Sequence, residues 1–145
     1  MNARADDLDA LQTTLAAEHA AVYVLATLGG RASQDETLLA AISGAYAEHR
    51  LRRDQLTTSI IDRGADPVAA EAAYDVPRLD SPRDVERAAV DLERACAATY
   101  AYLVANTAGA DRRLAIAALN DAAVRELAFR GTPETFPGLD EYTDR

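Results

Sequence analysis

The sequence predicts an all-α protein, a single four-helix bundle spanning residues 1–145, with a long connection between its second and third helices. Three observations support this prediction. Alanine dominates the sequence, and it favours helices because it loses no side-chain entropy on entering one. Along four segments, apolar residues recur at steps of three and four, the spacing of a buried helix face. The 145 residues, 49% of them hydrophobic, are enough to bury one core.

The first helix is expected over about residues 5–28. It should end at Gly29 and Gly30, because glycine readily takes the left-handed conformation that closes a helix. Glu18 occupies a position of the apolar stripe at which another apolar residue is expected. A carboxylate is therefore predicted to face the core from the middle of this helix. The remainder of the stripe is Leu8, Leu11, Leu15, Val22 and Leu25.

The second helix is expected over about residues 34–63, opened by a capping box of Ser33 and Glu36. His49 lies on its apolar stripe, and Glu48 lies beside it. The connection to the first helix is short, so the two helices should form an antiparallel hairpin. At a rise of ~1.5 Å per residue, the two Glu-His pairs, 18–19 and 48–49, then lie within about one turn of each other.

The segment 65–80 is the longest stretch without a helical pattern, although residues 68–74 are expected to form a short helical turn. Extended at ~3.3 Å per residue, the segment reaches roughly 50 Å. A helix of thirty residues is about 45 Å long, so the segment is long enough to follow the whole bundle. Both a crossover and a simple up-down topology are consistent with this length.

The third helix is expected over residues 82–107, with Ser81 as its N-cap and Pro82 at its first position. Glu93 lies in a row that flanks the apolar stripe of this helix. The fourth helix is expected over about residues 111–130. Ile116, Ala123 and Leu127 should widen its apolar face.

Glu126 and Phe129 share the apolar face of the fourth helix, and a turn near residue 109 brings Glu93 level with Glu126. The tail, residues 131–145, is expected to be irregular. Phe136 and Leu139 are expected to dock on the end of the bundle.

The charge of the chain excludes some classes of partner. The formal net charge is −9, and every basic side chain other than histidine is arginine. Such a surface repels the phosphates of nucleic acids and of anionic membranes. No segment has the pattern of a signal peptide or the ~20 apolar residues that span a membrane, and the single cysteine, Cys96, cannot form an internal disulfide. We therefore expect a cytoplasmic protein without nucleic-acid or membrane partners.

Glutamates near the middle of all four helices lie on or beside the apolar faces, and two of them precede a histidine. Helical bundles build metal sites from carboxylates and imidazoles that project inward from facing helices. Oxygen ligands with one or two imidazoles suit iron or manganese. The candidate metal ligands are Glu18, His19, Glu48, His49, Glu93 and Glu126.

Four residue runs resemble the ferritin-like superfamily, and most closely a small actinobacterial family of ferritin-like domains without an established function. These runs are 15–23, 46–54, 92–100 and 136–139, and the similarity covers nearly all 145 residues. The resemblance implies a ferritin-like bundle. Di-iron members use one glutamate from the first and third helices and a Glu-x-x-His motif from the second and fourth. Glu18 and Glu93 match the two single glutamates.

The sequence departs from the di-iron pattern on the other two helices. Three residues after Glu48 stands Leu51, and three residues after Glu126 stands Phe129, so both expected histidines are missing. The two histidines of the chain directly follow glutamates instead, about 100° round the helix. An adjacent Glu-His pair cannot hold one metal in the same way as Glu-x-x-His.

Two functions are consistent with the sequence. The first is a ferritin-like protein that binds iron or manganese through inward-facing carboxylates. The second is a metal-free interaction or scaffold module in which the same glutamates and histidines form a buried polar network with arginines. A homodimer is expected in both cases, while the substrate and any enzymatic activity stay open. The arginines close in sequence are Arg50, Arg52, Arg53, Arg94 and Arg125.

Overall fold

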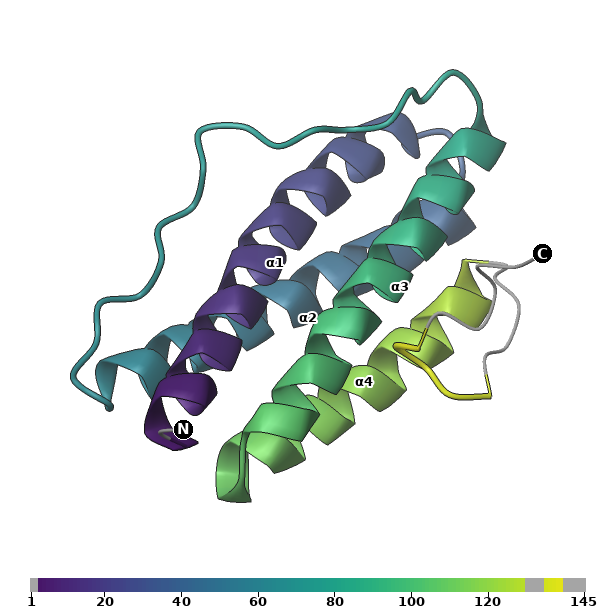
Figure 1. The fold of residues 1–145 in the computed structure, drawn as a ribbon. Helices are drawn as coiled ribbons and strands as arrows, with labels where there is room; N and C mark the ends of the chain where they lie inside the picture. The colour runs from purple at the N-terminus through teal and green to yellow at the C-terminus, as the bar shows by residue number, and fades with distance from the viewer. Residues whose placement is uncertain (1–2, 130–134, 140–145) are drawn as a thin grey trace.

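The computed structural model describes residues 3–129 and 135–139. This part of the chain is all-helical, without strands, and confirms the predicted four-helix fold (Figure 1). The helices are α1 (Ala3–Arg31), α2 (Glu36–Ile61), α3 (Pro82–Asn106) and α4 (Gly109–Ala128). None of the described helices is long and apolar enough to cross a membrane.

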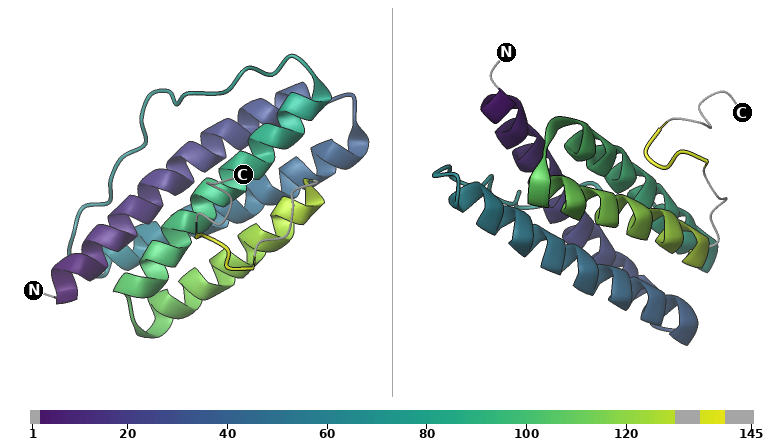
Figure 2. Two further views of the ribbon diagram at one scale, coloured as in Figure 1. Left: turned by 45° about the vertical axis from the view of Figure 1, so that its right-hand side comes forward. Right: turned by 90° about the horizontal axis from the view of Figure 1, so that it is seen from below.

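The bundle consists of two antiparallel hairpins, α1–α2 and α3–α4, packed against each other (Figure 2). Helix α1 packs on α2 and on α3, and α3 packs on α4, whereas α2 and α4 contact each other only weakly. The connection after α2 runs back along α1 to the start of α3, so that α2 and α3 run in the same direction (Figure 1). The structure therefore has a crossover and not a simple up-down topology.

Two helix ends differ from the prediction in the residues that form them. Helix α1 continues through Gly29 and Gly30, because neither glycine has the positive φ that closes a helix, and it ends at Arg31. Helix α2 is capped by Asp35 instead of Ser33, and the Asp35 side chain accepts a hydrogen bond of 2.9 Å from the Leu38 amide. The expected starts of α1 and α4 and the expected ends of α2, α3 and α4 differ by one or two residues, and residue 130 lies outside the described part.

The start of α3 agrees with the prediction. Ser81 is the N-cap, its side chain and that of Asp84 form a capping box, and Pro82 occupies the first helical position. At the other end of this helix, Thr107 is the C-cap, and α4 begins almost at once with Gly109, whose φ is 59°. This short link makes α3 and α4 a tight hairpin.

Large apolar side chains fill the two ends of the bundle, while the middle contains mostly small ones. Leu28, Ile42 and Phe129 pack at one end, and Leu15 and Ile60 pack at the other. Only the middle cluster consists mainly of alanines, which leave room there for longer polar side chains. Its members are Ala21, Cys96, Ala97, Tyr100, Ala118 and Ala122.

Ile116 and Leu127 do not widen the apolar face of α4 as predicted. Their exposed fractions are 44% and 49%, because both side chains lie on the side of α4 that faces away from the core. Glu126 and Phe129, which were predicted to face inward from the same helix, are buried.

An extended strap, residues 65–80, lies along the outer face of α1. Gln12 anchors it twice: its side-chain amide donates to the Asp66 carbonyl at 2.7 Å, and its side-chain oxygen accepts from the Val68 amide at 2.8 Å. Further along α1, the rings of Tyr23 and Tyr74 lie 5.5 Å apart. The predicted helical turn at 68–74 is absent, since contacts with α1 hold this segment extended.

The described part of the tail forms a tight turn against the middle of α3. The Leu139 amide donates to the Phe136 carbonyl at 3.1 Å, and Gly138 has a φ of 84°. A Cβ atom at Gly138 would lie 2.5 Å from the Ala97 carbonyl oxygen, so this turn requires glycine. The expectation that Phe136 and Leu139 dock on the bundle end is wrong, because the turn leaves their side chains largely exposed. The other residues of the tail, 131–134 and 140–145, lie outside the described part.

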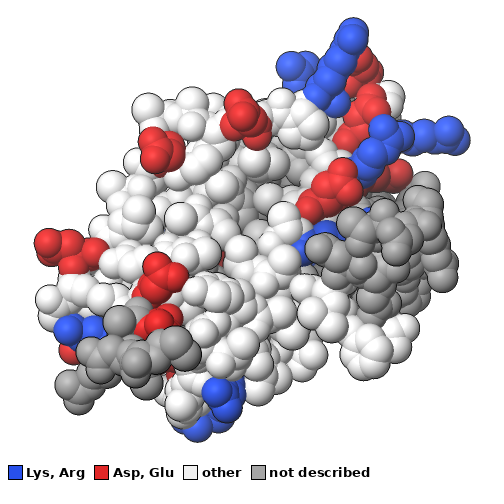
Figure 3. All heavy atoms as spheres, viewed as in Figure 1, with Lys and Arg blue, Asp and Glu red and all other residues white. Residues whose placement is uncertain are grey.

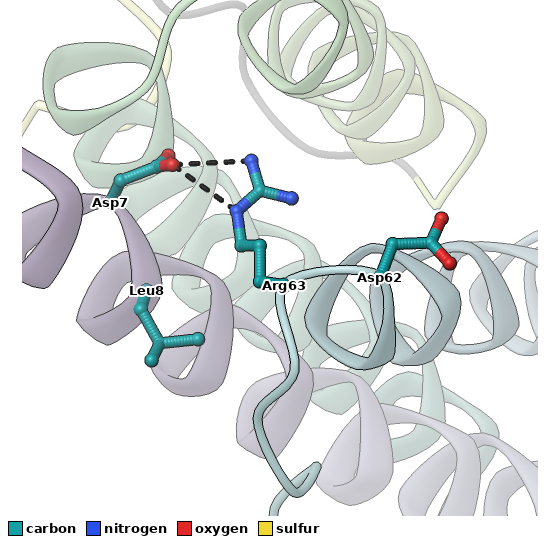
Figure 4. Close-up of a pocket in the computed structure, with 4 residues that line it drawn as sticks. All are labelled: Asp7, Leu8, Asp62 and Arg63. Carbon is teal, nitrogen blue, oxygen red and sulfur yellow. Dashed lines mark hydrogen bonds and ion pairs between the residues drawn. The ribbon is translucent and has the colours of Figure 1, made fainter.

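At the end of the bundle that holds the start of α1, Arg63 connects three helices. Arg63 follows directly after the end of α2 and donates to Asp7 of α1 at 3.1 Å (Figure 4). It also donates to Asp111 of α4. A pocket of about 610 Å³ is lined by Asp7, Leu8, Asp62 and Arg63. Figure 4 shows that Asp62 points away from the Asp7–Arg63 pair. The ion pairs of Arg63 with Asp7 and Asp111 therefore join the end of α2 to α1 and α4.

We expect the substitution Gln12→Ala to loosen the strap. Two hydrogen bonds between neutral groups are lost, each contributing about 1 kcal/mol. Amide hydrogen exchange at Val68 should become faster by about tenfold or more, as measured by NMR or mass spectrometry. The control is Thr13→Ala on the adjacent, exposed position, which should leave exchange at Val68 unchanged. Equal exchange rates in both variants would contradict the assigned anchoring.

Candidate functional site

Four of the six candidate ligands are buried at the middle of the bundle, one from each helix. The side chains of Glu18, His49 and Glu93 are fully buried, and Glu126 is only 2% exposed. Glu48 is exposed instead, because it lies beside the buried stripe of α2 and not on it.

His19 also lies away from this centre. It is on the outer face of α1, where its Nε2 atom donates to the Val68 carbonyl of the strap at 3.0 Å. The structure therefore places one histidine in the core and uses the other to hold the strap.

His49 lies between two carboxylates from two other helices. Its Nδ1 atom is 2.6 Å from Glu18 Oε2, and its Nε2 atom is 3.3 Å from Glu93 Oε1. Burial alone lowers the pKa of His49, but the hydrogen bonds and the charges of the two glutamates outweigh it and raise the pKa above its ordinary value. His49 is thus held as an imidazolium that links α1, α2 and α3.

Two ion pairs join helices α3 and α4, and one of them includes Glu93, a partner of His49. Arg125 Nε donates to Glu93 Oε1 at 2.8 Å, and Arg94 Nε donates to Glu126 Oε2 at 3.0 Å. Each helix therefore contributes one glutamate and one arginine in adjacent positions. Burial raises the pKa of Glu93, but the hydrogen bond and charge of His49, followed by those of Arg125, lower it below its ordinary value. Glu93 is consequently ionised in the core.

The second oxygen of Glu18 extends the network toward α4. The Tyr100 hydroxyl donates to Glu18 Oε1 at 2.5 Å and accepts from Arg52 Nη1 at 3.0 Å. Burial is the main reason that the pKa of Tyr100 is raised, so its hydroxyl stays protonated and remains a donor. Arg52 Nη2 then donates to Asp121 Oδ2 at 3.2 Å. Because the Asp121 side chain is 53% exposed, the network reaches solvent at this carboxylate.

The charges of this network balance. Four carboxylates, Glu18, Glu93, Asp121 and Glu126, face four cations, His49, Arg52, Arg94 and Arg125. Buried charges are tolerated only when they are paired and hydrogen-bonded, so the closed pairing explains how seven of these eight groups lie largely within the bundle.

The Glu93–Arg125 pair has one buried atom on each side chain without a hydrogen-bond partner in the described part of the chain. These atoms are Glu93 Oε2 and Arg125 Nη2. In contrast, both ring nitrogens of His49 and both carboxylate oxygens of Glu18 have hydrogen-bond partners.

Sequence reasoning named Arg52 only as one of several arginines that could join a buried network, and it missed the role of Asp121. A signal for Arg52 was present, because it continues the buried stripe of α2 three residues after His49. Arg52 was grouped with its neighbours Arg50, which is exposed, and Arg53, which is half-buried, and this grouping hid the spacing. No comparable signal exists for Asp121, which is exposed and joins the network only because α4 passes in front of Arg52.

The His49 pairing predicts how stability depends on pH. A folded-state pKa above the ordinary value of 6.5 stabilises the fold below pH 6.5, and this stabilisation is lost as the pH rises through the raised pKa. A Glu93 pKa below 4.5 acts in the opposite sense: its contribution is present above pH 4.5 and is lost as the pH falls through the lowered value. The contribution of these two groups to stability should therefore be greatest between pH 4.5 and pH 6.5, and it should fall at lower and at higher pH.

We expect His49→Gln to remove the decrease in stability above pH 6.5 and to destabilise the protein by about 3 kcal/mol at pH 6, since two buried carboxylates lose their charged partner. Urea unfolding followed by circular dichroism, repeated from about pH 4 to 9, measures both effects. The control is Glu48→Gln on the exposed neighbour, with an expected change within about 0.5 kcal/mol. A wild-type stability that is flat above pH 6.5 would refute the protonated, doubly paired histidine.

Comparisons with known proteins give a family and a fold without an activity. The curated proteins contain no match to this chain. The chain is similar to a solved crystal structure described as a conserved hypothetical protein, rv2844, from Mycobacterium tuberculosis. The two are 28% identical with a TM-score of 0.81, and the match covers 89% of this chain and 91% of that one. A family model described as a domain of unknown function matches residues 10–141, which include almost all of the four-helix bundle and its buried network. The chain therefore belongs to the family of this domain of unknown function, DUF4439.

Proposed function

We propose that this chain is a metal-free, ferritin-like helical module that acts by binding a partner, with a buried ionic network at the place where a metal centre would lie. The observation that carries the proposal is the pairing of both ring nitrogens of His49 with carboxylates. The single long crossover between two hairpins supports the ferritin-like part, since this connection is typical of ferritin-like bundles.

The buried residues do not fit iron or manganese well. A metal-binding histidine must be neutral and present a free nitrogen, whereas His49 is held protonated between Glu18 and Glu93. Both oxygens of Glu18 are also engaged. In the described residues, no group of three or more His, Cys, Asp or Glu side chains is arranged to hold a metal ion. The free oxygen of Glu93 is a single ligand atom, too few for such a site.

Arginines also occupy the surroundings that a dication would need. The guanidinium groups of Arg94 and Arg125 lie against Glu126 and Glu93, at 3.0 and 2.8 Å. Each brings a fixed positive charge, because arginine does not lose its proton in proteins. A divalent cation at the same carboxylates would be repelled by both. These contacts support a centre that is neutralised by side chains.

Metal analysis tests this proposal. Protein purified without chelator should contain no stoichiometric iron or manganese by mass spectrometry. Added Fe²⁺ or Mn²⁺ should leave the melting temperature unchanged, because no ligand set is free to bind them. The control is Glu93→Gln, which should likewise bind no metal while melting at a lower temperature. Stoichiometric metal that is lost in Glu18→Ala would overturn the metal-free centre and favour an iron or manganese site.

We further propose that the module works in the cytoplasm as a homodimer, without nucleic-acid partners. The net charge of −9 disfavours phosphate-rich partners. In the view of Figure 3, acidic and basic side chains lie mainly toward the edges of the molecule around a large uncharged area. The exposed apolar side chains of Ile116 and Leu127 on α4 support pairing with a second copy, since such side chains mark interaction surfaces when they gather on one face.

We expect Leu127→Glu to convert the dimer to a monomer at micromolar concentration, because a charge on an apolar interface must be desolvated without a partner. Light scattering coupled to size-exclusion chromatography measures the mass. The matched control is Leu51→Glu, which changes a leucine of similar exposure on another helix and should leave the dimer intact. A wild-type protein of monomeric mass would contradict this part of the proposal without affecting the metal-free centre.

A further inference from the structure

The edge between α2 and α4 is the open side of the bundle. The other neighbouring helix pairs pack closely, whereas α2 and α4 contact each other only weakly. A groove of about 260 Å³ lies between them. Glu48, Leu51 and Arg52 line it from α2, and Leu114, Ala117 and Asp121 line it from α4. The small side chain of Ala117 leaves space within this groove.

Arg52 gives the groove a buried charge. Its side chain is only 6% exposed, yet it lines the groove, because its inner nitrogen binds Tyr100 while its outer nitrogen reaches Asp121. A guanidinium has five N–H donors in one plane, and these two bonds use two of them. The guanidinium therefore has donors that these two bonds do not use, and carboxylates match its planar shape best.

Asp121 is a replaceable partner of Arg52. Their hydrogen bond is long, at 3.2 Å, and the Asp121 side chain is 53% exposed. The exposed Asp121 carboxylate can turn outward when a ligand carboxylate takes its place, because the buried guanidinium of Arg52 then stays paired. A ligand carboxylate at Arg52 would then keep the contact with Tyr100, and through it the link to Glu18.

The other charges of the groove select the ligand further. Glu48 and Asp121 carry two negative charges, and Arg52 carries one positive charge. A simple anion would be repelled by the two carboxylates, and a simple amine would be repelled by Arg52. A zwitterion satisfies both signs, with its carboxylate on Arg52 and its ammonium group beside Glu48 and Asp121. The apolar part of such a ligand would lie on Leu51, Leu114 and Ala117.

We propose that the groove between α2 and α4 binds a free α-amino acid with an apolar side chain of moderate size. Its volume of about 260 Å³ lies just below the range of about 300–1,000 Å³ that is typical of sites for drug-sized molecules. The ligand is therefore smaller than a drug-sized molecule. This inference goes beyond the proposed function, since it requires neither the homodimer nor a decision on metal.

Titration of the full-length, ¹⁵N-labelled protein with L-leucine tests the inference. Amide signals of the groove residues on α2 and α4 should shift and saturate below roughly 10 mM, a concentration that fills a millimolar site. Two analogues serve as ligand controls: 4-methylpentanoate lacks the ammonium group, and 3-methylbutylamine lacks the carboxylate. Each should bind at least about tenfold more weakly than L-leucine.

Two variants separate groove binding from other effects. Ala117→Leu should abolish the shifts by filling the groove, whereas Ala110→Leu, at an exposed position of the same helix, should leave them unchanged. Both variants keep all charged side chains, so they leave the buried network in place. Saturable binding of L-leucine that Ala117→Leu removes supports the inference. Absence of saturable shifts, equal binding of either analogue, or unchanged binding in Ala117→Leu would overturn it.

Discussion

The burial of His49 between Glu18 and Glu93 is the interaction on which the rest of the structure depends. The three side chains come from α1, α2 and α3, and the ring nitrogens of His49 lie 2.6 Å from Glu18 and 3.3 Å from Glu93. All three side chains are fully buried. An unpaired charge at such a depth costs several kcal/mol, so each of the three groups requires the other two. The relative rotation of α1, α2 and α3 is consequently fixed, because a helix turned by one residue would leave a carboxylate in the core without its partner.

The distribution of side-chain size makes this arrangement possible. At both ends of the bundle, leucine, isoleucine and phenylalanine side chains fill the core and supply the hydrophobic stabilisation. At the middle, Ala21, Ala97, Ala118 and Ala122 hold the helices apart only enough for arginine and glutamate side chains to lie between them. Larger apolar residues at these positions would displace the network, so the alanine content of the chain has a positional role as well as a helical one.

The fold and half of the network were predictable from spacing, and the reasons for the remainder are physical. Steps of three and four place Glu18, His49 and Glu126 on buried faces, and the structure confirms these positions. Glu48 lies one residue off the stripe of α2 and is exposed, so its choice as a candidate ligand did not follow from this rule. The partners of the buried groups could not be derived in this way. The ion pairs that Arg94 and Arg125 form between α3 and α4 depend on the register of these two helices. The contact of His19 with Val68 depends on the path of the strap.

The same carboxylates could be neutralised by metal ions or by side chains, and the count of charges supports the second solution. Glu18, Glu93 and Glu126 bring three negative charges to the middle of the bundle, and His49, Arg94 and Arg125 bring three positive ones. Adding even one dication would leave an excess of two positive charges in a core that cannot hydrate them, unless His49 lost its proton and an arginine moved out. Arg125, whose side chain is 14% exposed, and Arg94, at 34%, are held by bonds to nearly fully buried partners, which resist that movement. These three cations neutralise the buried carboxylates without a metal ion, which supports the proposal that the network itself is the centre of this protein.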